Sequence, residues 1–211
     1  MNPIQFFLRH QREILQATGE HIWLVGLTML FAIAIGVPLG ILVTRRPWLS
    51  KPILGGANIA ETIPSLALFG FLLPLPWLGG RADRLAIAAL TLYALLPIIR
   101  NTSAGIAGVD RAVREAARGM GMTDRQILFQ VELPLSFSTM LAGIRIATVL
   151  TIGIATIAAA VGAGGLGEFI FRGLAMVNNQ LILAGAIPAA LLALAADFVL
   201  GVLERRLRPV R

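Results

Sequence analysis

The chain has 211 residues, of which 57% are hydrophobic and 14% are charged, and its mean hydropathy is +0.81. Soluble domains carry about 25% charged residues, so this composition excludes an ordinary soluble protein and indicates a chain that folds in lipid. There is no cysteine, which excludes disulfides and cysteine nucleophiles, and the net charge of +7 comes from Arg placed mostly beside apolar segments, as in membrane topology signals rather than nucleic-acid-binding surfaces.

Residues 1–21 precede the first long apolar segment and form a predicted N-terminal segment outside the membrane or at its surface. They contain no apolar run of the kind found in a cleavable leader, so we expect no removable signal peptide. Their apolar side chains favour an amphipathic helix over residues 3–18 that lies in the membrane interface. A short solvated helix accounts for the same pattern and stays open as an alternative. The apolar positions are Ile4, Phe7, Leu8, Ile14 and Leu15.

Five apolar segments follow, each a candidate for a span of about 20 residues. They cover residues 22–44, 53–78, 85–99, 135–161 and 181–203. The third is short, and the second is interrupted by Pro64, Pro74 and Pro76. The predicted fold is therefore an all-α membrane protein with about five transmembrane helices in one domain, residues 22–203, followed by a basic cytoplasmic tail, residues 204–211.

The basic residues flank these spans unevenly, and cytoplasmic loops of membrane proteins carry the excess of Lys and Arg. Twelve lie after the first span, between the third and fourth spans or in the tail: Arg45, Arg46, Lys51, Arg100, Arg111, Arg114, Arg118, Arg125, Arg205, Arg206, Arg208 and Arg211. Five lie on the other side: Arg9, Arg12, Arg81, Arg84 and Arg172. The count predicts an N-terminus outside and a C-terminus in the cytoplasm, as an odd number of spans requires.

The segment between the third and fourth spans, residues 110–134, is polar and has strong local signals. Asp110 is a helix N-cap, and good helix formers continue to Arg118. Gly119 and Gly121 then permit a tight turn. A second short helix is expected, capped by Thr123 or Asp124, after which Pro134 resets the chain before it re-enters the membrane. A unit this small is not a domain, so we expect it to be presented to a partner.

This segment resembles the signature of the inner-membrane permeases of bacterial ABC importers. That signature is Glu-Ala-Ala, three residues, Gly, nine residues, an aliphatic residue, one residue, and Leu-Pro. Every spacing is kept, with Val in place of the usual Ile as the one departure, although Glu-Ala-Ala alone is a common helical tripeptide. The matching residues are Glu115, Ala116, Ala117, Gly121, Val131, Leu133 and Pro134.

The resemblance implies a type I ABC importer transmembrane domain in which residues 110–134 hold the coupling helix that docks into a separate ATPase. Ala116 and Ala117 would allow close seating, and Glu115 and Arg118 would pair with charges at the rim. The chain lacks the Gly-x4-Gly-Lys-Ser/Thr phosphate-binding loop, so ATP and Mg belong to the partner, and no cofactor or metal of its own is expected. The implied location is the bacterial inner membrane, spanned several times.

Four further stretches resemble the permeases for osmoprotectants such as glycine betaine, carnitine and choline: residues 62–68, 95–102, 143–145 and 161–167. The last also resembles methionine and phosphonate permeases, so methionine or another small solute is the alternative cargo. Such importers use two permease subunits, two ATPases and a substrate-binding protein. One permease domain is present here, so a homodimer or a pair with a similar subunit is implied.

Polar residues inside the predicted spans are candidates for the translocation path. Glu61 and Arg145 are each expected about 14 Å from the cytoplasmic ends of their spans. They are hypothesised to pair, in one subunit or across two, with separate snorkelling as the alternative. Asp197 is expected near the cytoplasmic surface, pairing with Arg100 or the tail arginines. The other path candidates are Pro64, Ser65, Tyr93, Asn101 and Thr102, although Ser and Thr often bond to their own helix.

A quaternary ammonium is normally held by aromatic rings, and the spans show no such cage. The three tryptophans, Trp23, Trp48 and Trp77, lie near predicted membrane boundaries. High-affinity recognition is therefore assigned to the binding protein. A flexible external loop is expected at residues 162–167, where that protein docks in the resembling family. An embedded enzyme or a scaffold is disfavoured, because both histidines precede the first span and the spans are broken and polar at their centres.

Overall fold

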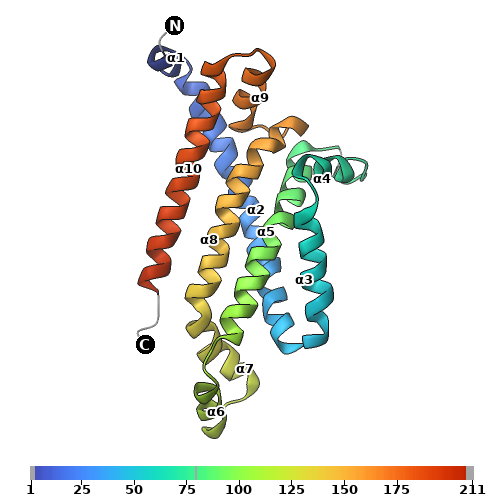
Figure 1. Ribbon diagram of the computed structural model, residues 1–211, viewed down its shortest axis with the longest axis vertical. Helices are drawn as coiled ribbons and strands as arrows, with labels where there is room; N and C mark the ends of the chain where they lie inside the picture. The colour runs from blue at the N-terminus through green and yellow to red at the C-terminus, as the bar shows by residue number, and fades with distance from the viewer. Residues whose placement is uncertain (1–2, 79, 208–211) are drawn as a thin grey trace.

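The computed structural model describes residues 3–78 and 80–207, and these form helices joined by turns, without a strand. Figure 1 shows them as an elongated bundle with a small helical projection at one end. In chain order the elements are α1 Pro3–Arg9, α2 Gln11–Arg45, α3 Pro47–Thr62, α4 Ser65–Leu72, α5 Ala82–Ala107, α6 Arg111–Gly119, α7 Asp124–Ile127, the π-helical η1 Leu128–Glu132, α8 Leu133–Ala158, the 3-10 turn η2 Ala159–Val161, α9 Gly167–Ala175 and α10 Asn179–Arg206.

Four stretches of the described chain are long and apolar enough to cross a membrane. They are α2, α5, the continuous helix from Asp124 to Val161, and α10. The expected second span is instead a pair of helices, α3 and α4, that meet at 105°, so five spans are reached when this bent pair counts as one. The bend lies at Pro64. The preceding residue, Ile63, is extended, which is the conformation that a residue before proline prefers. Pro74 and Pro76 lie beyond α4 in turns.

The core lies where α5 packs against both α2 and α8, and α5 is the most buried of the spans. Small residues permit this approach, as is usual between helices in lipid. A Cβ on Gly40 of α2 would lie 2.5 Å from the side chain of Thr102, and one on Gly143 of α8 would lie 2.4 Å from that of Asn101. In contrast, α10 buries little of its surface within the chain.

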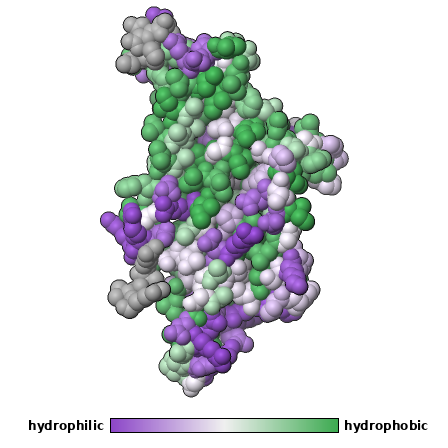
Figure 2. Space-filling model, viewed as in Figure 1, coloured by the Kyte–Doolittle hydropathy of each residue, from purple (hydrophilic) through white to green (hydrophobic). Residues whose placement is uncertain are grey.

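The two ends of the bundle differ, and we name them by their short helices. At the α6 end lie α6, α7 and the end of α10; at the α9 end lie α1, α9 and the bend into α4 (Figure 1). Figure 2 shows apolar side chains over the middle and the α9 end and polar ones concentrated towards the α6 end. The first and last described helices therefore begin and end on opposite sides of the apolar body.

The N-terminal region differs from the expected single helix over residues 3–18. The helix breaks at His10, whose ring stacks on Phe6 with a centroid distance of 4.2 Å, and residues 11–18 belong to the first span. Because α2 has 35 residues and is about 52 Å long, it extends well beyond a hydrocarbon layer of about 30 Å. The division into residues 1–21, 22–203 and 204–211 stays a prediction, and residues 208–211 lie outside the described residues.

The glycine-rich stretch after α8 is packed against the bundle, so the expectation of a flexible loop is wrong. Gly162, Gly164 and Gly165 adopt positive φ angles of 83°, 77° and 78°. The N–H of Gly165 donates to the Glu20 carboxylate at 3.2 Å, and Leu166 is fully buried. The helix α9 that follows was not expected; a Cβ on its first residue, Gly167, would lie 1.9 Å from the Thr156 carbonyl.

Candidate functional site

The segment 110–134 has the predicted helix–turn–helix form, built from local contacts. The Asp110 carboxylate accepts from the N–H of Ala112 at 2.9 Å, capping α6. Gly121, with a φ of +82°, closes the turn in the left-handed region. Thr123 and Gln126 then form a reciprocal capping box at the start of α7. Local sequence signals thus determine the projection at the α6 end (Figure 1).

The three signature residues on α6 and the neighbouring Arg118 face two ways. Glu115, Ala116 and Arg118 are exposed, whereas Ala117 is only 2% exposed. The Ala117 side chain therefore holds α6 against its own chain, and Ala116 is the alanine available to a partner. Glu115 accepts from Arg111 Nε one turn earlier at 2.7 Å, an exposed pair that a partner could readily exchange.

Pro134 does not reset the chain, contrary to expectation. The helix is continuous from Asp124 to Val161 and passes through η1 immediately before the proline. In η1 the N–H of Leu133 bonds to the Leu128 carbonyl, five residues back. This wider turn accommodates a ring that would clash with the carbonyl four residues back in an α-helix. Leu133 is half-buried and Pro134 is exposed at the start of α8.

One functional candidate in this segment that the sequence pattern does not indicate is a buried carboxylate, Glu132, which is 2% exposed. It accepts from Arg45 at the end of α2, and its other oxygen lies 3.3 Å from Arg114 Nε on α6. We call these three residues the Glu132 cluster. Its sequence signal is weak, because Glu132 occupies the unspecified position of the signature. The available clue was an acidic residue at a membrane boundary, facing loops rich in arginine.

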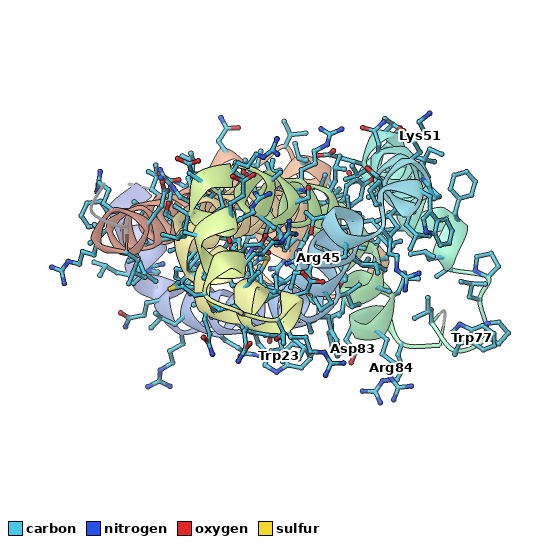
Figure 3. The ribbon with its side chains drawn as sticks, turned by 90° about the horizontal axis from the view of Figure 1, so that it is seen from below. Trp23, Arg45, Lys51, Trp77, Asp83 and Arg84 are labelled. Atoms are coloured by element: carbon cyan, nitrogen blue, oxygen red, sulfur yellow. The ribbon has the colours of Figure 1, made fainter. Side chains whose placement is uncertain are left out.

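The Glu132 cluster borders a cavity of about 400 Å³ at the α6 end. Seen from that end, Arg45 lies in the middle of the bundle, whereas Lys51 lies at its edge on α3 (Figure 3). The cavity is also lined by the hydroxyl-bearing residues Thr44, Ser50 and Ser103. The two arginines outnumber the one carboxylate, so this end of the bundle carries a partly neutralised positive charge.

Tyr93 and the bend at Pro64 belong together. The Tyr93 hydroxyl donates to the carbonyl of Ile63, which α3 leaves unpaired where it ends. Tyr93 is only 6% exposed, so its ring packs in the core while its hydroxyl stabilises the bend. Pro64 is exposed and Ser65 is half-buried as the first residue of α4. These three predicted path residues are therefore brought together at one place.

Asn101 and Thr102 lie between packed helices. The Asn101 side chain donates to the Pro97 carbonyl of its own helix at 2.8 Å, beside α8. Thr102 is fully buried against α2, and its hydroxyl has no hydrogen-bond partner within the described part of the chain. Ser103 bonds back to the Arg100 carbonyl at 3.0 Å, as hydroxyls in helices commonly do.

The expected pair between Glu61 and Arg145 is wrong within this chain. Arg145 Nε and Nη2 donate to the Asp197 carboxylate at 2.6 and 2.8 Å, and its Nη1 donates to Glu204 at 3.3 Å. Both carboxylates come from α10, which packs along α8, while α3 with the exposed Glu61 stands on the other side of the bundle (Figure 1). A pair across two copies stays a prediction.

Among the described residues Asp197 pairs with Arg145 and not with the expected Arg100, while the alternative partners Arg208 and Arg211 of the tail lie outside the described residues. Arg100 donates instead to the Asn58 side chain at 3.2 Å. A Cβ on Gly201 would lie 2.9 Å from Arg145 Nη1, so this glycine makes room for the guanidinium against α10. We call Arg145, Asp197 and Glu204 the Arg145 cluster. Among the described residues no group of three or more His, Asp and Glu is placed to hold a metal ion.

Comparison with protein families decides the identity of the fold. Residues 36–209 match the model of the binding-protein-dependent transport system inner membrane component. The chain belongs to this family. It is thus a transporter subunit of the inner membrane and not an enzyme, and ATP is used by a separate ATPase partner. The prediction made from the signature in residues 110–134 is confirmed at this level.

Curated relatives match over nearly the whole chain. The carnitine transport permease of Listeria monocytogenes is 45% identical, covering 98% of this chain and 93% of the relative. The osmoprotectant import permease of Salmonella typhimurium is 42% identical, covering 99% and 98%. The choline transport system permease of Bacillus subtilis is 41% identical, covering 98% and 94%.

Solved structures show the same fold at lower identity. The inward-facing methionine ABC transporter MetNI aligns with a TM-score of 0.85 and 23% identity, covering all of both chains. A bacterial alginate ABC transporter, solved with its substrate-bound periplasmic protein, aligns with a TM-score of 0.70 and 18% identity, covering 99% of this chain and 88% of that one. The expected all-α importer fold is confirmed.

Proposed function

We propose that this chain provides the translocation path of an importer for quaternary-ammonium osmoprotectants of the glycine betaine, carnitine and choline type. The observation that carries the proposal is the match of 40–46% identity, over almost the full chain, to permeases named for these solutes. Tyr93 uses its hydroxyl to hold a bend, and the three tryptophans are exposed at 55%, 70% and 72%. Figure 3 shows Trp23 and Trp77 far apart, which supports recognition by a separate binding protein.

The cargo is tested by uptake of labelled glycine betaine, choline, carnitine and methionine. The chain is expressed with its ATPase and binding protein in bacteria that lack their own osmoprotectant uptake systems. We expect accumulation of at least one quaternary ammonium and none of methionine. Methionine is the second candidate, favoured by the fold shared with the methionine transporter. Accumulation of methionine alone would overturn the proposed cargo.

The exposed face of α6 is proposed as the ATPase-docking surface, with Glu115, Ala116, Arg118 and the turn at Gly121, while Leu133 and Pro134 begin the adjoining span. ATP-driven closure of the ATPases would draw two such helices together and turn the path outward. Glu115→Ala and Gly121→Ala are expected to reduce uptake while the protein stays in the membrane. Gly119→Ala is the matched control, since it adds the same methyl group at a neighbouring helical glycine with free space. Unchanged uptake in both test variants contradicts docking.

A second permease copy and a periplasmic binding protein are proposed as the remaining partners. Glu61, Pro64, Ser65 and the outer surface of α3 would face the shared path, since Glu61 is exposed although it lies in an apolar segment. A charged side chain at that position needs protein or water around it. The binding protein would meet the α9 end. The proposed assembly is tested by gentle purification of the complex and determination of its subunit stoichiometry. Two permease chains per complex are expected.

The proposed orientation places the N-terminus outside and the α6 end in the cytoplasm. Because the chain has no cysteine, single cysteines report sidedness directly. Val177, 88% exposed beside α9, and Met120, 76% exposed after α6, suit this test. A membrane-impermeant maleimide should label Val177→Cys in intact cells and Met120→Cys only in inverted vesicles, prepared without the ATPase that is proposed to cover the turn after α6. The reverse pattern contradicts the orientation.

A further inference from the structure

The helix α6 is attached to the rest of the chain by few contacts. It projects from the bundle and packs only sparsely on its own chain (Figure 1). The Arg114 side chain supplies an attachment beyond the backbone. Its Nη2 donates to the carbonyls of Ile106 and Ala107 at 2.7 and 3.0 Å, at the end of α5. Its Nε faces the Glu132 carboxylate at 3.3 Å. One side chain thus ties α6 to α5 and to η1.

The Glu132 carboxylate extends this connection to a third span. Arg45, the last residue of α2, donates to one oxygen while Arg114 faces the other. The Glu132 side chain is 3% exposed, so its charge has little water and depends on the two guanidinium groups. Losing either arginine leaves the carboxylate under-paired. The cluster is therefore constrained to move as a unit.

The surroundings of the cluster permit such movement. Glu132 lies in η1, and single π-helical turns inside long helices are frequent at functional sites. The adjacent cavity of about 400 Å³ leaves free volume beside the three side chains. Among the residues that line the cavity, the charged ones are Arg45, Arg114 and Glu132. The cluster therefore has a side-chain contact on each of α2, α6 and η1, and free volume beside these contacts in which the side chains can shift.

We propose that Glu132 is a positioning residue through which displacement of α6 is transmitted to α2 and to the start of α8. When α6 moves, Arg114 moves with it and displaces Glu132 through their ion pair. Glu132 in turn displaces Arg45, which bonds to its other oxygen. The span α10 has no part in this cluster and follows only through its packing on α8. The inference rests on the proposed docking of an ATPase on α6. It adds that the ion cluster, rather than the backbone alone, couples that docking to the path.

The test uses the complete importer in proteoliposomes, with glycine betaine uptake and ATP hydrolysis measured on the same samples. Glu132→Gln keeps the shape of the side chain and removes its charge. Uptake per ATP hydrolysed is expected to fall by about tenfold or more, since two arginines lose their counter-charge. Arg45→Gln is the second variant, because it leaves the pair between Arg114 and Glu132 in place. Arg46→Gln is the matched control: it removes the same charge one residue along, outside the cavity.

A covalent tether separates transmission from simple stability. Arg114→Cys combined with Glu132→Cys should uncouple uptake from hydrolysis, and a flexible bis-thiosulfonate linker should restore coupling until it is reduced. Unchanged uptake per ATP in Glu132→Gln, or in Arg45→Gln if the first variant does not assemble, overturns the proposal. So does a loss of assembly and hydrolysis in proportion to uptake. Failure of the wild-type importer to accumulate glycine betaine, choline or carnitine instead overturns the cargo, and the ratio of variant to wild type is then measured on methionine.

Discussion

The two ion clusters of this protein are built in opposite ways. In the Glu132 cluster one carboxylate sits between two arginines, while in the Arg145 cluster one arginine sits between two carboxylates. In the first cluster the central carboxylate is 3% exposed and connects α2, α6 and η1 through Arg45 and Arg114, whose side chains are 36% and 28% exposed. The second connects only α8 and α10, and the side chains of Arg145 and Asp197 are 34% and 44% exposed. The difference lies in the central group: the Glu132 carboxylate is shielded from its surroundings within this chain, whereas the central Arg145 of the second cluster is partly exposed.

This contrast fits the burial of the spans. The Glu132 cluster stands beside the most buried span, α5, and the Arg145 cluster lies on the least buried, α10. A half-exposed ion pair in an apolar segment is costly unless protein, water or headgroups surround it. We therefore expect substitutions in the first cluster to act mainly on this chain. Substitutions in the second should also respond to the lipid or to neighbouring subunits.

The largest effect is expected from Glu132→Ala, which leaves two arginines beside a cavity without their carboxylate. Because Arg45 and Arg114 are 36% and 28% exposed and can reach water, the loss should stay below the cost of about 3–5 kcal/mol for breaking a fully buried pair. The melting temperature of the purified protein in detergent, followed by loss of the monodisperse chromatographic peak, measures this change. Combining Glu132→Ala with Arg114→Leu should recover part of the loss. A melting temperature equal to that of the wild type would show that the Glu132 carboxylate does not contribute to the stability of the fold.

A smaller effect is expected from Asp197→Ala. Arg145 then keeps Glu204 but loses its bidentate partner, and the exposure of both groups weakens the pair. The melting temperature should fall less than in Glu132→Ala and should depend more on the lipid or detergent used. Glu204→Gln, which weakens the longer of the Arg145 contacts, serves as the milder comparison. An equal response of the Glu132 and Asp197 variants to a change of lipid would remove the distinction between the clusters.

Gly201→Ala should have a still smaller effect that is specific to the Arg145 cluster. The new methyl group would lie 2.9 Å from Arg145 Nη1, which is the end of a flexible side chain and can shift. Because the guanidinium is planar and its Cζ would lie 3.1 Å from the new Cβ, the shift loosens the contacts with Glu204 and with Asp197 together. The melting temperature should therefore fall slightly in the wild-type background and not at all once Asp197→Ala has freed the guanidinium to move. A clear additional loss in the double variant would assign another role to Gly201.

The smallest effect is expected from Arg111→Ala on α6. Its pair with Glu115 is exposed and spans one helical turn, so its loss should change stability by at most about 0.5 kcal/mol. This variant measures what an exposed pair contributes beside the two clusters. A melting temperature within error of the wild type is the expected result. A fall comparable with Asp197→Ala would show that α6 stability itself depends on this pair.

The features that could be predicted are those that depend on neighbours along the chain. The capping by Asp110 and Thr123, and the turn at Gly121, involve contacts over two or three residues, so the sequence contains all their partners. The spans were placed by hydropathy, which reports burial in lipid or protein without needing the fold. The family signature combines such local signals, which is why the permease assignment was within reach.

The failures concern partners brought together by packing. Equal depth suggested a pair between Glu61 and Arg145, but depth says nothing about which side of the bundle a helix occupies. Glu132 was overlooked because its partners, Arg45 and Arg114, come from separate parts of the chain. The glycines around Gly165 predict a flexible stretch, because glycine permits motion, but they do not show what packs against it. Its contact with Glu20 from the first span holds it in place.

By itself the sequence determined the membrane location, the helix–turn–helix at residues 110–134 and the transporter family, because each follows from composition or from contacts a few residues apart. Only the tertiary structure decided the 105° bend at Pro64, the buried position of Glu132 and the partners of Arg145. These depend on how helices are arranged around one another, since an ion pair or a tight approach requires two surfaces to meet. The Glu132 cluster was likewise decided by the tertiary structure, because three distant segments of the chain meet at its carboxylate.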